Sequence, residues 1–149
     1  MTAVYVAAPY EDAAFVRDVV HESLRHRGYV VTSTWAESAT GPENFARFSP
    51  EQLRRACATN DCDVMVANVV LVLARHGAGG EMFAEARYAL TLGRPLVWCG
   101  HLRLSAWREG VVRCSDLNAA YYALACIDDA MRRGVRHAED LANSVPEGR

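Results

Sequence analysis

The stretch Val4-Tyr5-Val6-Ala7-Ala8-Pro9-Tyr10 decides the fold class of this chain. Its first five residues form a continuous apolar run rich in β-formers, which is typical of a strand buried on both faces. The proline and tyrosine end that strand, and two acidic residues then place negative charge in the first turn of a helix. The helix keeps its apolar residues at helical spacing as far as Gly28, which suits a C-cap.

A second β-branched run, Tyr29-Val30-Val31-Thr32-Ser33-Thr34-Trp35, follows this helix. Strand, helix and strand in this order make a βαβ unit, whose crossover is right-handed. Later strands and helices alternate in the same way. We expect strands at Asp63–Val70, Pro95–Cys99 and, as a short one, Val111–Arg113, and helices at 51–59, 81–92 and after 116. This alternation predicts an α/β fold with a doubly wound parallel sheet of four to five strands and helices on both faces.

Length and composition fit a single domain over residues 1–149, with a flexible tail after about residue 141. Apolar residues make up 51% of the chain and charged residues 23%, an ordinary globular mixture. The net charge of −2 gives no reason to expect duplex nucleic acid or an anionic membrane as a partner. No apolar run approaches the roughly 20 residues that span a bilayer, and no signal peptide is recognisable. We therefore expect a cytoplasmic protein.

The cysteines and histidines predict no metal site. The five cysteines contain no Cys-x-x-Cys pair, and the five histidines are scattered without ligand-like spacing. Reduced, buried thiols are the simplest interpretation. The chain also has neither a Walker loop nor a Gly-x-Gly-x-x-Gly fingerprint, so we expect no cofactor.

Ligands of doubly wound sheets bind beyond the carboxyl ends of the strands, where the strand order reverses. Tyr10 and Trp35 lie at such ends and could stack on a flat base or simply pack in the fold. The glycines after the third predicted strand could cradle a phosphate or ribose, or form a plain loop. The polar segment 36–50 has the length of a functional lid. The candidate ligand-binding residues are Ala7, Pro9, Tyr10, Trp35, Asn68, Gly79 and Gly80.

Glu85 is the candidate catalytic carboxylate. It stands four residues after Glu81 on the predicted helix, at the edge of the apolar stripe of that helix. A carboxylate at such a border can point into a cleft and serve as nucleophile or general base. Spacing alone favours a solvated helix glutamate.

Three segments together resemble the nucleoside 2-deoxyribosyltransferase superfamily, which includes the 2′-deoxynucleoside 5′-phosphate N-hydrolases. Val4–Tyr10 is similar to the family's opening strand and its small-Pro-aromatic turn, and Asp63–Asn68 to its central strand. Gly79–Leu90, followed by Gly93–Val97, is similar to its glycine turn, nucleophile helix and next strand. The resemblance covers roughly residues 4 to 113 and implies a flavodoxin-like sheet and a nucleoside or nucleotide as the small-molecule partner.

The resemblance also implies roles for individual residues. Glu85 would attack the anomeric carbon of the sugar, and the glycosyl-enzyme would pass to water or to another base. Tyr5 would orient the glutamate. Arg103–Trp107 is similar to a stretch of the N-hydrolases whose serine reaches the 5′-phosphate bound by a neighbouring subunit, so Ser105 favours a 5′-monophosphate substrate. The family's shared sites imply a homodimer or a higher homo-oligomer.

Three departures from the family pattern keep a second function open. Ala8 replaces the glycine before the proline, and the spacing from the glycine pair to the catalytic glutamate is one residue longer. In the family an aspartate assists the departing base, and Arg55 occupies its expected position here. Asp61 could substitute for that aspartate only if the helix shifts register. The alternatives are therefore an N-glycosidase or deoxyribosyltransferase, and a degenerate nucleotide-binding or regulatory module that uses the same pocket.

Overall fold

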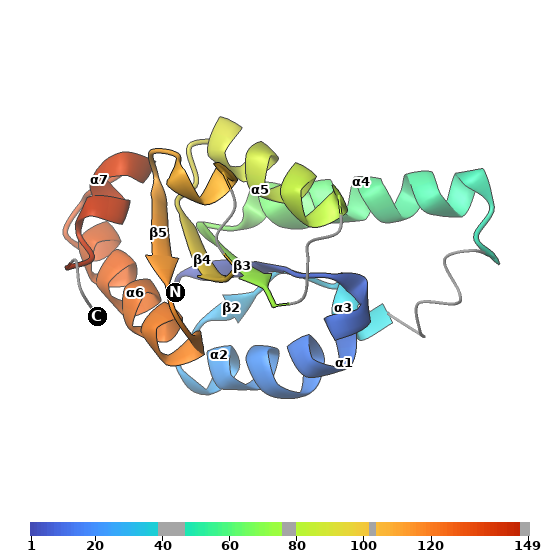
Figure 1. Ribbon diagram of the computed structural model, residues 1–149, viewed down its shortest axis with the longest axis horizontal. Helices are drawn as coiled ribbons and strands as arrows, with labels where there is room; N and C mark the ends of the chain where they lie inside the picture. Colours follow the sequence, from blue (N-terminus) through green and yellow to red (C-terminus); the bar gives the residue numbers. More distant parts are fainter. Residues whose placement is uncertain (39–46, 76–79, 102–103, 147–149) are drawn as a thin grey trace.

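The computed structural model describes residues 1–38, 47–75, 80–101 and 104–146. Its centre is a five-stranded, all-parallel sheet with the order β2-β1-β3-β4-β5 (Figure 1). The strands are β1 (Ala3–Ala7), β2 (Val30–Val31), β3 (Val69–Ala74), β4 (Leu96–Gly100) and β5 (Val111–Cys114). The predicted doubly wound α/β fold is confirmed.

Helices cover both faces of this sheet (Figure 1). The helix after β1 is continuous from α1 (Ala13–Phe15) through a π-helical segment (Val16–His21) to α2 (Glu22–His26). It shares one face with α6, whereas α4 and α5 cover the other. The remaining helices are α3 (Trp35–Ser38), α4 (Pro50–Val66), α5 (Gly80–Thr91), α6 (Leu117–Arg132) and α7 (Ala138–Asn143).

Alternating strand residues feed two separate cores. In β1, Val4 and Val6 pack with the α1–α2 helix and α6, while Tyr5 and Ala7 pack with α4 and α5. Every residue of β3 is buried, as a central parallel strand requires. The β1 side chains that face α5 therefore lie on the same face as Glu85.

The prediction of a strand at Asp63–Val70 is wrong. Ser49 and Gln52 form a capping box, Pro50 occupies the first turn, and α4 continues to Val66 before β3 begins at Val69. The apolar run 64–74 spans both the last helical turn and the strand, so periodicity could not locate the boundary between them. At 63% exposure, Val66 lacks the burial that a central strand would give it.

Two other boundaries differ from the prediction. Trp35, placed at the end of the second strand, instead opens α3, and β2 is confined to two residues. Of the segment 36–50 predicted as a lid, residues 39–46 lie outside the described part. No helix in the described part is long and apolar enough to cross a membrane.

Gly100 allows the carboxyl ends of β3 and β4 to approach closely. Its φ is +104°, and a Cβ at this position would lie 2.5 Å from the carbonyl oxygen of Ala74. That carbonyl accepts a hydrogen bond from the backbone N–H of His101. A side chain at position 100 would therefore strain the backbone and also disturb this contact.

We predict that Gly100→Ala lowers the free energy of unfolding more than Gly134→Ala does. Gly134 also has a positive φ, +95°, but a Cβ there would meet nothing within 4 Å. The control should lose about 1–2 kcal/mol from backbone strain, and Gly100→Ala at least about 1 kcal/mol more because of overpacking. Urea unfolding of both variants measures the difference, and equal losses would contradict the close approach.

Candidate functional site

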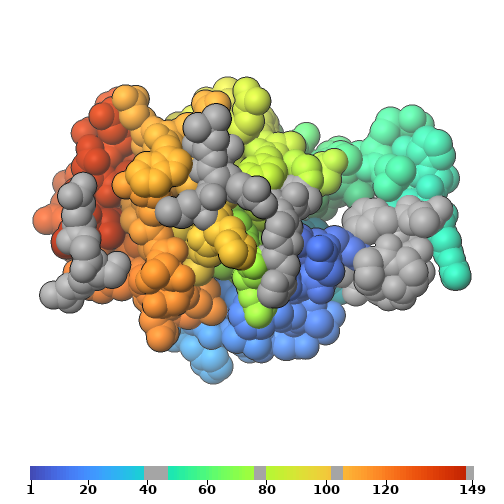
Figure 2. All heavy atoms as spheres, in the orientation of Figure 1, coloured from blue at the N-terminus to red at the C-terminus, as the bar shows by residue number. Residues whose placement is uncertain are grey.

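A pocket of about 440 Å³ opens beside the carboxyl ends of β1 and β2. One wall is the turn after β1, a second is α3 with the residue before it, and a third is α4 between Leu53 and Asn60. The first turns of α5 close the base. Figure 2 shows the outer end of α4 standing out from the body of the molecule on this side.

Glu85 presents a buried carboxylate to this pocket. The residue is 8% exposed, and its Oε1 accepts a hydrogen bond from Nδ2 of Asn60 at 3.0 Å. Burial raises the pKa of Glu85 to about 7, although the neighbouring Tyr5 hydroxyl and Asn60 amide oppose the shift. The negative charges of Glu81 and Asp61 raise this pKa further. The carboxyl group is therefore poised between acid and base near neutral pH.

Tyr5 lies in β1 beside this carboxyl group. The phenol is fully buried, and its hydroxyl faces the Glu85 carboxyl group without meeting the full geometry of a hydrogen bond. Burial, and then the charge of Glu85, raise the pKa of Tyr5 above its ordinary value. The phenol therefore stays neutral and keeps a proton that it can donate towards Glu85.

The structure brings together five of the predicted site residues. Pro9, Tyr10, Trp35, Gly80 and Glu85 all line the pocket. Their elements are far apart in the sequence, but parallel strands end at one edge of the sheet and so gather them there.

Other predicted residues lie differently. Ala7 is buried in β1, one position before the pocket wall. Asp61 is exposed on α4 and is not part of the pocket lining, so it reaches Glu85 only through its charge. Gly79 and the side chain of Ser105 lie outside the described part.

Asn68, a predicted ligand-binding residue, is not part of the pocket lining. Asn68 precedes β3 and lies at the amino edge of the sheet, where its Oδ1 accepts a hydrogen bond from the backbone N–H of Ala3 at 2.8 Å. Its own N–H donates to the carbonyl of Ala3. The misplaced strand boundary explains the prediction, because Asn68 was assigned to the carboxyl end of a strand that begins after it.

Sequence reasoning missed Asn60, the α4 residue that contacts Glu85. Arg55, which was matched to the family's assisting aspartate, is exposed and pairs with Glu51. The family's aspartate lies about two helical turns before the central strand. Because the predicted strand begins earlier in the sequence than β3 does, the position predicted for the aspartate is too early as well. The group that faces the carboxylate from α4 is a neutral amide.

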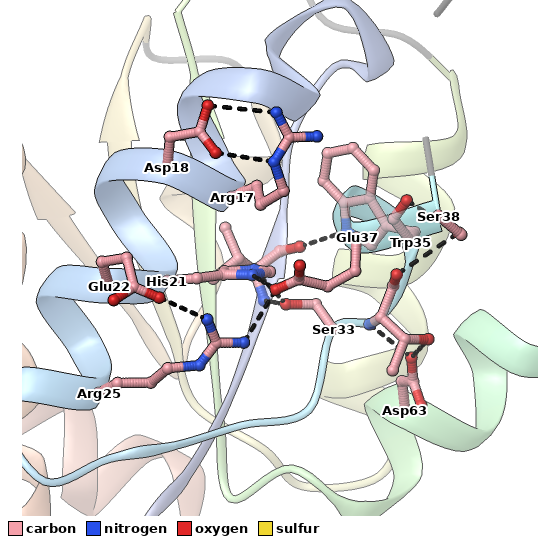
Figure 3. Close-up of polar contacts among 12 residues, drawn as sticks. Arg17, Asp18, His21, Glu22, Arg25, Ser33, Trp35, Glu37, Ser38 and Asp63 are labelled. Atoms are coloured by element: carbon pink, nitrogen blue, oxygen red, sulfur yellow. Dashed lines mark hydrogen bonds and ion pairs between the residues drawn. The ribbon is translucent and has the colours of Figure 1, made fainter. Parts of the chain in front are cut away.

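Hydrogen bonds on three sides hold the pocket wall around α3 (Figure 3). Thr34 donates both its N–H and its hydroxyl to Oδ2 of Asp63, at 2.9 and 2.7 Å. Nε1 of Trp35 donates to the carbonyl of Val6 at 2.8 Å. These bonds hold the indole next to Tyr10, with ring centroids 6.3 Å apart and planes inclined by 37°. The two rings give the pocket an aromatic wall for a flat ligand.

The third support is a buried histidine. Nε2 of His21 lies 3.0 Å from the hydroxyl of Ser33, and Nδ1 lies 3.2 Å from Oε1 of Glu37, which also pairs with Arg25 (Figure 3). Burial lowers the pKa of His21, so a neutral ring that accepts from the serine and donates to the glutamate fits both contacts. Ser33 also accepts from the N–H of Val6, which joins this cluster to β1.

The pocket is acidic in its described part. Glu11, Glu81 and Glu85 all line it, and no lysine, arginine or histidine does so among the described residues. The described residues also contain no group of His, Cys, Asp and Glu suited to a metal ion. The chemistry available here is that of a buried carboxylate beside an apolar and aromatic cavity.

Comparisons with known proteins place the fold. No protein-family model matches the chain, and no curated protein matches it by sequence. The structure is similar to that of a 2-deoxyribosyltransferase from the psychrotolerant bacterium Bacillus psychrosaccharolyticus, with a TM-score of 0.58 and 17% identity. The match covers 78% of this chain and 88% of the other. The resemblance drawn from the sequence is thus confirmed for the fold.

We predict that Glu85 makes stability depend on pH in one direction. The folded state holds the Glu85 proton up to about pH 7, whereas the unfolded chain releases it near the ordinary value of 4.5. The protonated Glu85 therefore makes its whole contribution to the free energy of unfolding below pH 4.5. That contribution is lost as the pH rises from there through about 7. Relative to Glu85→Gln, the wild type should lose up to about 3 kcal/mol across this window. Urea titrations of both proteins at several pH values test this, and a pH-independent difference would show that Glu85 ionises normally.

Proposed function

We propose that this chain cleaves the N-glycosidic bond of a nucleoside or nucleotide, with Glu85 as the nucleophile, and passes the sugar to water or to a second base. The observation that carries the proposal is the buried Glu85 carboxylate at the base of a pocket with an aromatic wall. The fold shared with a 2-deoxyribosyltransferase supports the same type of reaction.

The reaction follows from the surroundings of Glu85. A carboxylate with a pKa of about 7 has a substantial ionised fraction at neutral pH, and burial leaves it poorly solvated and reactive. An Oε atom would bond to the anomeric carbon as the bond to the base breaks. Asn60 and Tyr5 hold or face the carboxyl group and would fix its direction of attack. Water or another base would then displace the carboxylate.

The 5′-phosphate and the oligomer remain part of the proposal. Ser105 of a neighbouring subunit would bind the phosphate in a homodimer, which is the role that the family resemblance implies. The three glutamates that line the described pocket would repel a phosphate placed among them. The phosphate would therefore have to lie away from this wall, towards the neighbouring subunit.

We predict that Glu85→Gln and Glu85→Ala abolish base release. Removing a nucleophile commonly lowers kcat by several orders of magnitude. The assay incubates the protein with ribo- and deoxyribonucleosides and their 5′-monophosphates and separates free bases by chromatography. Glu139→Gln, an exposed change on α7, is the matched control and should behave as wild type. Base release by Glu85→Gln at the wild-type rate would remove Glu85 from the mechanism.

The amide of Asn60 supports a second candidate function, in which the chain binds a nucleotide without cleaving it. An amide cannot supply the proton that a departing neutral base requires. In that case a nucleoside or nucleotide would raise the melting temperature while no product forms. The same substrate panel, followed by thermal unfolding and by chromatography, separates the two functions.

A further inference from the structure

The group that contacts the Glu85 carboxylate from α4 is the amide of Asn60. Its Nδ2 lies 3.0 Å from Oε1 of Glu85, and Asn60 itself lines the pocket. When a glycosidic bond breaks, the electron pair of that bond moves to the nitrogen of the base. A neutral base then leaves as an anion unless an acid protonates it, and an amide cannot act as that acid.

The other polar groups of the pocket suit a positive charge. Glu11 and Glu81 line the same cavity as Glu85, so three glutamates from two elements contribute to its lining. The Tyr10 and Trp35 rings line the same cavity, and the faces of aromatic rings attract cations. Both features would stabilise a flat, positively charged ring, whereas an anionic group would meet repulsion.

We infer that the substrate is an N-glycoside whose base carries a positive charge, such as a pyridinium or an N-alkylated purine nucleoside. This inference rests on the proposed function and specifies its substrate class. Such a base leaves as a neutral molecule, so no acid is needed and Asn60 suffices. Asn60 acts as a positioning residue, because it holds the Glu85 carboxyl group that attacks the sugar.

The bonds and charges balance without a further reactant. An Oε atom of Glu85 forms a bond to the anomeric carbon while the carbon–nitrogen bond breaks, and its electron pair neutralises the base. Water then attacks the same carbon, and the glycosyl–carboxylate bond breaks to regenerate Glu85. The net reaction consumes one water and yields the free sugar, the neutral base and one proton released to solvent.

The test compares cationic and neutral substrates that differ by one methyl group. The pairs are 7-methylguanosine with guanosine and their 2′-deoxy forms, with nicotinamide riboside as a pyridinium substrate. Rates are measured slightly below neutral pH and corrected for spontaneous hydrolysis. The wild type should cleave the methylated member with a kcat/KM at least about 100-fold higher, since acid assistance is commonly worth that factor for the neutral member.

Asn60→Asp is the decisive variant because it supplies an acid at the position that lacks one. It should raise guanosine cleavage and so reduce the cationic-to-neutral ratio of kcat/KM at least about tenfold. Asn143→Asp, with the same charge change on α7 and away from this pocket, should leave the ratio unchanged. Replacing Glu11 and Glu81 by glutamine should raise the KM of nicotinamide riboside relative to that of guanosine.

The outcomes separate this inference from the proposed function. Guanosine cleavage as fast as that of 7-methylguanosine, dependent on Glu85, would overturn the cationic substrate but keep the glycosidase. A cationic-to-neutral ratio unchanged by Asn60→Asp in a folded variant would overturn it as well. Absence of base release from every substrate, or release that persists in Glu85→Gln, would overturn the proposed function itself.

Discussion

The Glu85 carboxyl group is removed from water yet has no ion pair among the described residues. Asn60 donates one hydrogen bond to it, and Tyr5 lies against it from the sheet. Neither neighbour carries a positive charge, so the folded protein gains little by ionising this group. The same arrangement leaves a reactive oxygen at the base of the pocket and lowers the stability of the charged state. The burial that makes the Glu85 carboxylate reactive therefore also lowers the stability of the folded protein when Glu85 is ionised.

The aromatic wall owes its position to contacts that lie outside the pocket. Thr34 is held by Asp63 from α4, and Trp35 by a carbonyl of β1. His21 adds a support from the π-helical segment of the preceding helix. Segments of this kind are rare and often occur near functional sites. Here the segment ends at the residue whose imidazole reaches Ser33 and Glu37, behind the wall.

The sheet was predictable because strands buried on both faces are continuous apolar runs, such as Val4–Ala8. The turn residues followed from the rule that ligands bind at the carboxyl ends of such strands. Glu85 followed from its place at the edge of the apolar stripe of its helix and from the family resemblance. The boundary between α4 and β3 was not predictable, because apolar residues continue through Asn68 into the strand without a change that periodicity can detect. That one error displaced Asn68 into the site and hid Asn60. Asn60 and Glu85 lie on different helices, so their hydrogen bond is a tertiary contact that no local sequence pattern predicts.

The two sides of the pocket differ in how firmly they are built. The β1 turn and α3 rest on the sheet, whereas α4 is a 17-residue helix in which Val64 alone is buried. Isolated helices of this length are only marginally ordered in water, so the outer half of α4 depends on its cap and on whatever fills the cavity. A ligand that contacts Leu53 and Ala56 would therefore tighten this helix as it binds. Ordering α4 would reduce the net free energy of binding for such a ligand. A molecule too small to reach across the cavity would not contact α4 and would leave it unchanged.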